Sequence, residues 1–395
     1  MSEEWTARKI GSFGRVVTGK TPSTKEADNF DGPYPFITIP DLDGRVFVGR
    51  AERTLSEKGA VSMRNLLLPA NAVMMSCIAT IGKCGITTKP SFTNQQINSV
   101  ICHDDVEPRY LYYCFTQLGH ALDAAGGGGS VYTNVSKSRF SDIEVEIPSL
   151  PEQRAIAGVL GALDDKIELN RRMNETLEAL AQAEFGRLKD ENGRMKAVPL
   201  PEVIEVNPQR PLRKGEVAPY LDMANMPTRA ARALEVYDRE FGSGMRFMDG
   251  DTLVARITPC LENGKTCFVD FLGDGKVGWG STEYIVLRPK PPLPPEYAYF
   301  LARTEDFRNF AISNMTGTSG RQRVPADSLN HFLVEVPPVK LAERFGQFAR
   351  TVFAKMKAND EESRTLAALR DALLPKLLSG AVRVDTQKNK EPHND

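Results

Sequence analysis

The sequence predicts a mixed α/β fold in which two similar globular domains alternate with two long helices that pack as an antiparallel coiled coil. The prediction rests on an internal repeat. A short apolar segment ending in proline comes before a long helical pattern twice, at Pro148 and at Pro337. The two copies match at one spacing of 189 positions, which also relates Leu177 to Leu366. About 140 residues of globular composition precede each helical pattern, as expected of a duplicated unit.

The repeat divides the chain into five segments. The expected segments are a first globular domain (1–150), a first helix (151–190), a second globular domain (191–338), a second helix (339–384) and a disordered polar tail (385–395). Within them, Gly186 is expected to end the first helical pattern and Pro375 the second, with a short strand over 381–384.

Each helical pattern carries a seam of apolar residues in alternating steps of four and three, which is the a/d spacing of a coiled coil. An asparagine lies in each seam, and it disfavours a shifted register because a slipped helix leaves a buried amide without a partner. At a rise of 1.5 Å per residue, roughly 36 residues give a rod of about 55 Å. The alternative is that these are two ordinary surface helices of separate domains. The matched seams argue against that alternative. The seam residues expected to pack are Ile156, Leu160, Leu163, Ile167, Asn170, Leu177, Phe345, Val352, Met356, Asn359 and Leu366.

The globular domains also correspond, at spacings that drift between 180 and 187 positions. A turn and strand at 70–74 parallel those at 250–254, and Gly82-Lys83 parallels Gly264-Lys265. The drift indicates that loop lengths diverged while the scaffold was kept. Short apolar strands are expected at 72–77, 85–88, 252–257 and 284–287.

Composition and charge narrow the function. The chain of 395 residues has a net charge of −1, and residues 1–150 hold 15 basic against 16 acidic side chains. Any nucleic-acid binding must therefore come from local patches or a basic partner. The N-terminus lacks the pattern of a signal peptide, and no run of about 18 apolar residues predicts a membrane span. Six cysteines without CxxC spacing and four scattered histidines predict reduced thiols in a cytoplasm and no metal site.

One segment imitates a nucleotide-binding loop. Residues 14–21 match the pattern GxxxxGK[ST] letter for letter. That motif needs a buried strand before it and a helix starting at the Gly-Lys pair. Here Pro22 follows directly and favours extended geometry at Thr21. We therefore expect no phosphate site in this segment.

Two further segments imitate enzyme motifs. Residues 271–275 match the FxGxG of methyltransferases that bind S-adenosylmethionine, but the partner segment at Asn207-Pro208 lacks the second proline and the aromatic residue. A Gly-rich hairpin turn is the simpler interpretation. Asp41 with Asp164-Asp165-Lys166 only loosely resembles a nuclease centre. The chain is therefore expected to be non-catalytic.

Two Gly-rich loops before the helices, with the residues that follow them, carry most of the candidate DNA-binding residues. The others, Lys20, Thr21, Lys83, Arg256 and Lys265, lie elsewhere in the globular domains. Residues 126–130 and 316–320 let the backbone approach a ligand closely. Arg can bond guanine in the major groove, and Asn or Gln can bond adenine. The residues expected to contact DNA are Lys20, Thr21, Lys83, Gly128, Ser130, Tyr132, Asn134, Lys137, Arg256, Lys265, Ser319, Arg321, Gln322 and Arg323.

The order of several short motifs carries a family resemblance. They are Gly19-Lys20-Thr21-Pro22-Ser23, Ala79-Thr80-Ile81-Gly82-Lys83, Asn94-Gln95-Gln96-Ile97-Asn98, Pro151-Glu152-Gln153, Cys260-Leu261-Glu262-Asn263-Gly264-Lys265, Thr282-Glu283-Tyr284-Ile285 and Leu373-Leu374-Pro375-Lys376-Leu377. Over about residues 5–384 the chain resembles the specificity subunit of type I restriction–modification systems. One departure is Lys340-Leu341-Ala342-Glu343, where Pro-x-x-Glu-Gln is more usual.

The resemblance implies two target recognition domains, each of which reads one half of a bipartite asymmetric sequence in double-stranded DNA. It implies that the paired helices set the gap and dock two methylation subunits. Those subunits bind S-adenosylmethionine, and restriction subunits that use ATP and magnesium cut the DNA. The resemblance implies no cofactor in this chain. The alternatives are a coiled-coil scaffold without DNA contact, or a fused methyltransferase fragment that binds S-adenosylmethionine itself.

Overall fold

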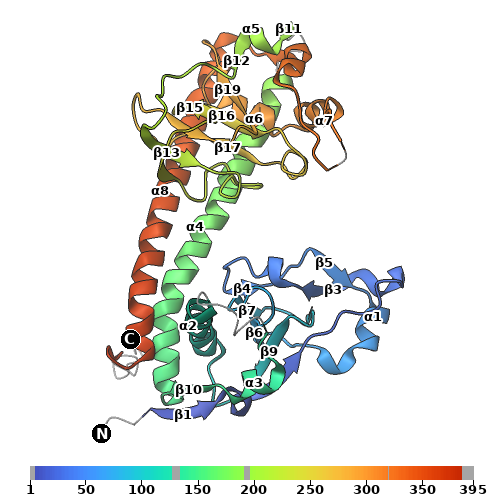
Figure 1. Cartoon of the computed structure of the whole chain (residues 1–395), viewed down its shortest axis with the longest axis vertical. Coiled ribbons are helices and arrows are strands. Elements are labelled where there is room, and N and C mark those ends of the chain that lie inside the picture. Colours follow the sequence, from blue (N-terminus) through green and yellow to red (C-terminus); the bar gives the residue numbers. More distant parts are fainter. Residues whose placement is uncertain (1–4, 127–133, 191–195, 319, 385–395) are drawn as a thin grey trace, which may run out of the picture. The chain divides into compact units, whose positions relative to one another are not determined.

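The computed structural model describes residues 5–126, 134–190, 196–318 and 320–384. They form two compact units. Unit 1 contains residues 1–169 and 362–395, and unit 2 contains residues 170–361. Each unit holds one globular region, one part of the helix α4 (Leu150–Asp190) and one part of the helix α8 (Val339–Leu378) (Figure 1). The mixed α/β fold with two globular regions and two long helices confirms the prediction.

The globular region of unit 1 contains an inner sheet of order β2-β9-β6-β7-β4, an outer sheet of order β5-β3-β8 and a ribbon of β1 and β10. The helix α2 lies between the inner sheet and α4 (Figure 1). The elements of this region are β1 (Thr6–Lys9), η1 (Ile10–Ser12), β2 (Gly14–Thr18), η2 (Ala27–Asn29), β3 (Phe30–Ile37), η3 (Ile39–Asp41), β4 (Phe47–Val48), β5 (Arg53–Leu55), α1 (Glu57–Ser62), η4 (Arg64–Leu66), β6 (Val73–Ser76), β7 (Cys84–Thr87), β8 (Phe92–Thr93), β9 (Ile97–Cys102), α2 (Pro108–Gly126), α3 (Lys137–Asp142) and β10 (Glu144–Ile147).

Unit 2 repeats this plan with an inner sheet of order β12-β19-β16-β17, an outer sheet of order β14-β13-β18-β15 and a ribbon of β11 and β20. The four strands expected from apolar runs are present as β6, β7, β16 and β19. The elements of this region are β11 (Lys196–Pro199), α5 (Leu200–Val203), β12 (Ile204–Val206), β13 (Val217–Leu221), β14 (Tyr237–Glu240), β15 (Met245–Phe247), β16 (Thr252–Ala255), β17 (Thr266–Phe268), β18 (Gly278–Gly280), β19 (Tyr284–Pro289), α6 (Tyr297–Ala302), α7 (Glu305–Ser313), η5 (Ala326–His331) and β20 (Leu333–Val336).

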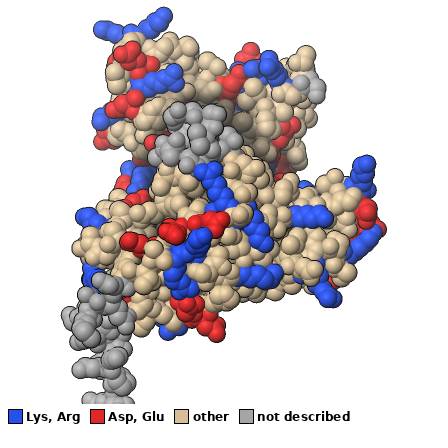
Figure 2. All heavy atoms as spheres, turned by 60° about the horizontal axis from the view of Figure 1, so that its bottom comes forward, with Lys and Arg blue, Asp and Glu red and all other residues tan. Residues whose placement is uncertain are grey.

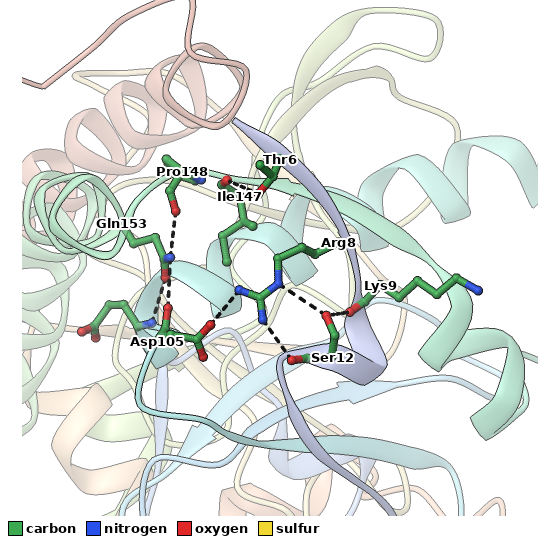
Figure 3. A network of polar contacts seen from close by, with 9 residues as sticks. Thr6, Arg8, Lys9, Ser12, Asp105, Ile147, Pro148 and Gln153 are labelled. Atoms are coloured by element: carbon green, nitrogen blue, oxygen red, sulfur yellow. Dashed lines mark hydrogen bonds and ion pairs between the residues drawn. The ribbon is translucent and has the colours of Figure 1, made fainter. Parts of the chain in front are cut away.

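The start of α4 is fixed by a polar junction in unit 1. The ribbon strand β10 leads directly into α4, and the buried side chain of Gln153 bonds the chain around it. Its amide nitrogen donates to Asp105 O and Pro148 O, and its oxygen accepts from the backbone N–H of Glu107 at 2.9 Å. Figure 3 shows this network beside Arg8, which pairs with the Asp105 carboxylate at 2.8 Å.

The outer turns of both long helices pack into the globular cores. In unit 1, Ile156 and Leu160 of α4 join Leu374 of α8 in one cluster with α2 and the inner sheet. In unit 2, Phe345 of α8 joins Phe185 of α4 in the equivalent cluster. Burying each such side chain contributes about 1.5–3 kcal/mol. The seam residues therefore pack on the globular regions as well as on the opposite helix.

The asparagines of the two seams meet within unit 2. Asn170 and Asn359 are both buried, and the Asn170 side-chain amide donates to Asn359 O at 3.3 Å. The Asn359 amide donates to Asn174 Oδ1 at 2.7 Å, and the Asn174 amide donates to Asp360 Oδ1 at 2.8 Å. Residue numbers fall along α8 as they rise along α4, so the helices are antiparallel, as the sequence predicts. The remaining seam residues Leu163, Ile167, Leu177 and Leu366 are half-buried, and Val352 and Met356 are buried.

Two predictions about helix ends and one about a strand are wrong. Gly186 lies inside α4, because Phe185 and Leu188 on either side of it are buried and outweigh the roughly 1 kcal/mol that a helical glycine costs. Pro375 lies inside α8, where its carbonyl still accepts from Ser379 N at 3.1 Å. No strand forms over 381–384, since Gly380 turns the chain with φ 69°. The predicted tail and residues 191–195 lie outside the described residues.

The three imitated motifs have structural roles. The GxxxxGK[ST] segment begins with the strand β2, so it forms no phosphate loop. Residues 271–275 turn between β17 and β18, where the Asp249 carboxylate accepts from the backbone N–H groups of Leu272 and Gly273, both at 2.9 Å. These strands pair with other strands, so the turn is not the expected hairpin. Asp165 pairs with Arg109 at 2.7 Å instead of forming a nuclease centre.

Candidate nucleic-acid interface

Loops of unit 1 bring several candidate residues to one edge of the globular region. Lys20 and Thr21 follow β2, and the Lys20 N–H donates to Thr93 O at 3.0 Å. The Thr21 hydroxyl donates to Gln95 Oε1 at 2.7 Å. Gly19 permits this approach, because a Cβ there would lie 2.3 Å from the carbonyl oxygen of Asn94. The β2 loop and the loop between β8 and β9 are thereby held side by side.

Asn134 joins the same edge through backbone pairing. It forms a bridge with Ile78, and the next residue, Val135, donates its N–H to Cys77 O at 2.9 Å. Cys77 in turn donates its N–H to Gln96 O at 2.7 Å. We call the residues Lys20, Thr21, Gln95, Gln96 and Asn134 edge 1. The sequence prediction did not include Gln95 and Gln96 as site residues, although the repeat pairs them with Thr282 and Glu283.

The other candidates of unit 1 are less closely placed. Lys83 is exposed on the turn between β6 and β7, where it lines a cavity of about 630 Å³ with Tyr112 and Arg370. Lys137 is exposed at the first position of α3, directly after the N-cap residue Ser136. The candidates Gly128, Ser130, Tyr132 and Ser319 lie outside the described residues.

Unit 2 presents its candidates on the same backbone frame. Arg256 donates its N–H to Glu283 O at 3.0 Å, and Val324 donates its N–H to Arg256 O at 2.9 Å. Arg323 forms a bridge with Ile257. These contacts repeat those of Cys77, Gln96, Val135 and Asn134 in unit 1. Asn134 and Arg323, which are 189 positions apart, therefore occupy equivalent places, and we call Arg256, Glu283, Arg321, Gln322 and Arg323 edge 2.

Two of the predicted contact residues in unit 2 are already engaged inside the chain. The Arg323 guanidinium pairs with the Glu283 carboxylate at 2.8 Å, and this hydrogen-bonded carboxylate raises the pKa of Arg323. Lys265 Nζ donates to the carbonyl oxygens of Met223 and Ala224. Arg321 is exposed and Gln322 is half-buried. Of the five residues of edge 2, Arg321 is therefore the exposed one.

The surface carries mixed charge. On the face that Figure 2 shows, Lys and Arg side chains are interspersed with Asp and Glu side chains. Local groups such as those of edges 1 and 2 must therefore supply any attraction to phosphate.

The remaining titratable groups of the described ranges do not point to other chemistry. These ranges contain no group of three or more His, Cys, Asp and Glu side chains suited to a metal ion, and no helix there is long and apolar enough to cross a membrane. Burial raises the pKa of Cys77 to about 11 and that of Cys114 to about 12. Both thiols stay protonated at neutral pH, where a thiol is a poor nucleophile.

Comparison with known proteins gives concordant results. The type I restriction modification DNA specificity domain matches residues 2–179. The type I restriction enzyme MjaIX specificity subunit of Methanocaldococcus jannaschii is 25% identical over 417 residues, which cover 97% of this chain and 94% of that protein. The HindI specificity subunit of Haemophilus influenzae is 33% identical over 183 residues, which cover 45% of this chain and 40% of that protein.

A solved structure shares the fold. The crystal structure of the S subunit of a type I restriction–modification system from M. genitalium matches with a TM-score of 0.54 and 16% identity, over 95% of this chain and 96% of that one. At this identity the match concerns the arrangement of the elements alone.

Proposed function

The chain belongs to the family of type I restriction–modification specificity subunits, and we propose that each of its two units reads one half of a bipartite asymmetric DNA target. In this proposal α4 and α8 set the number of unspecified base pairs between the halves and dock two methylation subunits. The chain itself is non-catalytic. S-adenosylmethionine, ATP and magnesium belong to the methylation and restriction subunits.

The observation that carries the proposal is the shared frame of edges 1 and 2. The same three backbone contacts present Asn134 in unit 1 and Arg323 in unit 2. The side chains on that frame differ, since Cys77 and Gln96 of unit 1 correspond to Arg256 and Glu283 of unit 2. A common scaffold with different polar groups suits two modules that read different base sequences, because bases are distinguished by hydrogen bonds at their edges.

The charge of the chain is compatible with this role when partners are present. Phosphate contacts supply a large share of the affinity of DNA-binding proteins, and a chain of net charge −1 has no overall positive charge to attract phosphate. The methylation subunits therefore contribute part of the contacts with the phosphate backbone. Edges 1 and 2 contribute the discrimination between base sequences.

Methylome sequencing of the host, with and without this gene, tests the proposal. We expect deletion to remove adenine methylation at one split motif, made of two short words and a fixed gap. The motif also identifies the target. An unchanged methylome in a host that expresses the complex would contradict the proposal and favour a scaffold without DNA contact.

Insertion of one heptad into both α4 and α8 tests whether the helices set the gap. Seven residues add about 10.5 Å of helix, which corresponds to about three base pairs at 3.4 Å each. We expect the methylated motif to keep both words and to gain about that number of unspecified positions. A matched control replaces exposed residues of both helices without changing their length. An unchanged gap in the lengthened variant would show that the helices are not the ruler.

A further inference from the structure

The outer sheet of unit 2 presents a row of aromatic and basic side chains. Tyr237 of β14 lies opposite Tyr220 of β13, which lies opposite Trp279 of β18, which lies opposite Arg246 of β15. Residues directly opposite in a sheet point to the same side. Arg239 lies two positions after Tyr237 and shares that side. We call Tyr220, Tyr237, Arg239, Arg246 and Trp279 the aromatic–basic face.

Both arginines of the face lie over aromatic rings. The Arg239 guanidinium carbon is 4.8 Å from the centre of the Tyr220 ring and 5.6 Å from that of Trp279. The Arg246 guanidinium is 5.8 Å from the ring of Phe241, which itself packs edge-on against Trp279. Such contacts hold a guanidinium in place by attraction to the ring while its charge is kept.

The face points away from the core of unit 2. Leu221 and Phe247, the neighbours of Tyr220 and Arg246, point to the other side and lie in the core cluster beneath the sheet. On the aromatic–basic face, Arg239 is exposed, Tyr237 is 39% exposed and Arg246 is half-buried. The basic groups of the face are thus within reach of a partner.

The two arginines also keep their charge uncompensated. In the ranges that the structure covers, neither guanidinium forms an ion pair with a carboxylate. By contrast, Arg323 pairs with Glu283 and Arg232 pairs with Asp270 in the same unit. The charged residues of the face itself are therefore two cations, and the Asp222 carboxylate adjoins the face at the Tyr237 hydroxyl. The two guanidinium groups favour an anionic partner.

A short stretch of chain connects the face to edge 2. Trp279 is followed by Gly280 and Ser281, whose hydroxyl accepts from Glu283 N at 3.1 Å in edge 2. On the other side, the Tyr237 hydroxyl bonds Asp222 at 3.2 Å. Asp222 directly precedes Met223 and Ala224, whose carbonyl oxygens accept from Lys265 Nζ. Since Trp279 and Glu283 are four positions apart, the chain between them spans at most about 14 Å, which places the face close to edge 2.

Unit 1 has a related row in its outer sheet, but the aromatic residues of that row are covered. Arg53 of β5 lies opposite Phe36, which lies opposite Phe92, and the Arg53 guanidinium is 4.4 Å from the Phe30 ring. There, however, Phe36 and Phe92 pack under residues of α1 and the turn after it in a cluster with Ala60 and Met63. In unit 2 Trp279 is likewise buried, but Tyr237 and both arginines of the face remain accessible.

We propose that the aromatic–basic face binds the sugar–phosphate backbone of DNA beside the half-site that unit 2 reads. The inference rests on the proposed DNA recognition and adds a second contact surface to it. A guanidinium presents N–H donors in a fixed fork that matches phosphate oxygens. Contacts of this kind set the position of a protein on the duplex and carry no sequence information of their own. The face thus orients unit 2 so that Arg321 and Gln322 meet the base edges.

The test uses the complex with its methylation subunits and the double variant Arg239→Met, Arg246→Met. Methionine keeps an apolar side chain over the rings while it removes the charge, so the sheet is expected to fold. Binding is measured against salt concentration on a duplex with the methylated motif and on an unrelated duplex. We expect both affinities to fall by a similar factor. The slope of log K against log salt should become shallower by about 1.8, at about 0.9 for each phosphate that an arginine no longer neutralises.

Two control variants sharpen the result. Lys196→Met, Lys290→Met removes the same charge from exposed positions of unit 2, on β11 and directly after β19, outside both long helices, and should leave the slope at its original value. Arg239→Lys, Arg246→Lys keeps the charge and should restore most of the slope. An unchanged slope in the first double variant, with specific binding intact, would overturn the inference. If that variant instead lost methylation subunits at an unchanged slope, the face would be a protein interface. Failure of the unaltered complex to prefer the motif would contradict the proposed function itself.

Discussion

In unit 1, the carboxylate of Asp164 on α4 accepts from the Tyr113 hydroxyl at 2.5 Å and pairs with Arg370 of α8 at 2.6 Å. In unit 2, the residues 189 positions from Asp164 and Arg370 are Phe353 and Ala181, and both lie in the apolar cluster. The same two places on the helix pair thus hold an ion pair in one unit and an apolar contact in the other.

The starts of the two helices differ in the same way. Gln153 of α4 is buried and makes the three hydrogen bonds that Figure 3 includes. Its counterpart on α8 is Ala342, which is fully buried and belongs to the apolar cluster of unit 2. This is the position where the sequence departs from the usual Pro-x-x-Glu-Gln. The departure changes the chemistry of the junction while the strand-to-helix connection is kept.

The comparison distinguishes the buried apolar positions, which both units share, from the buried polar side chains, which differ between them. Two examples of positions that stay apolar in both copies are Ile156 with Phe345 and Leu374 with Phe185, and each of these side chains is buried. A buried polar group can be exchanged for an apolar one at low net cost when all its partners change together. Two units of one architecture can therefore carry different polar networks.

The largest expected loss of stability comes from Phe353 of unit 2, which takes the place of Asp164 in unit 1. Phe353→Ala removes a buried ring that packs edge-on against Phe268 at 4.6 Å. We expect it to lower the free energy of unfolding of unit 2 by about 3–5 kcal/mol. Denaturant unfolding followed by hydrogen exchange measures the loss in each unit separately. Leu180→Ala, at a half-exposed position of α4 in the same unit, is the control and should change stability by less than about 1 kcal/mol. A similar loss in both variants would contradict the account.

Loss of the Asp164–Arg370 ion pair in unit 1 should have a smaller effect on stability, and further substitutions should reverse it. Arg370→Ala leaves the nearly buried Asp164 carboxylate without its cation, and we expect a loss of about 2–3 kcal/mol in unit 1, because Arg370 is itself partly exposed. In unit 2 the counterpart of Tyr113 is Phe300, at a spacing of 187 positions. The triple variant Tyr113→Phe, Asp164→Phe, Arg370→Ala therefore copies Phe300, Phe353 and Ala181, and it should recover most of this loss. If the triple variant is less stable than the single one, the two sites are not interchangeable.

The smallest of the three effects concerns the helix start. Gln153→Ala leaves the Glu107 N–H without its acceptor and should lower the stability of unit 1 by about 1–2 kcal/mol. Protection of the Glu107 amide from hydrogen exchange reports the loss locally. Gln182→Ala is the comparison, since that side chain makes one long hydrogen bond of 3.4 Å, and its effect should be smaller. Equal effects would show that the junction does not depend on Gln153.

The sequence was informative about the duplicated fold because buried positions repeat at one spacing. The seam and its asparagines predicted two antiparallel helices. The helix ends were mispredicted at Gly186 and Pro375, where burial of Phe185 and Leu374 outweighs local preference. Propensity describes neighbours in the chain, whereas these residues are held by contacts with distant segments.

The candidate site was less predictable. Arg323 and Lys265 belong to the right loops, but their side chains bind Glu283 and backbone carbonyls inside the unit. The aromatic–basic face depends on a parallel pairing of β13 with β18, which joins Tyr220 to Trp279 across 59 positions. No local pattern in the sequence indicates that pairing.

The most direct test of the two-module account is the sequence preference of the complex carrying Arg321→Ala, Gln322→Ala. Its binding is measured on duplexes in which each position of the methylated motif is changed in turn. We expect discrimination to fall in one half of the motif only, by about 1–3 kcal/mol at the bases concerned, while the other half is read as before. Asn134→Ala in unit 1 should affect the opposite half. Equal loss of discrimination in both halves from either variant would contradict the assignment of one half to each unit.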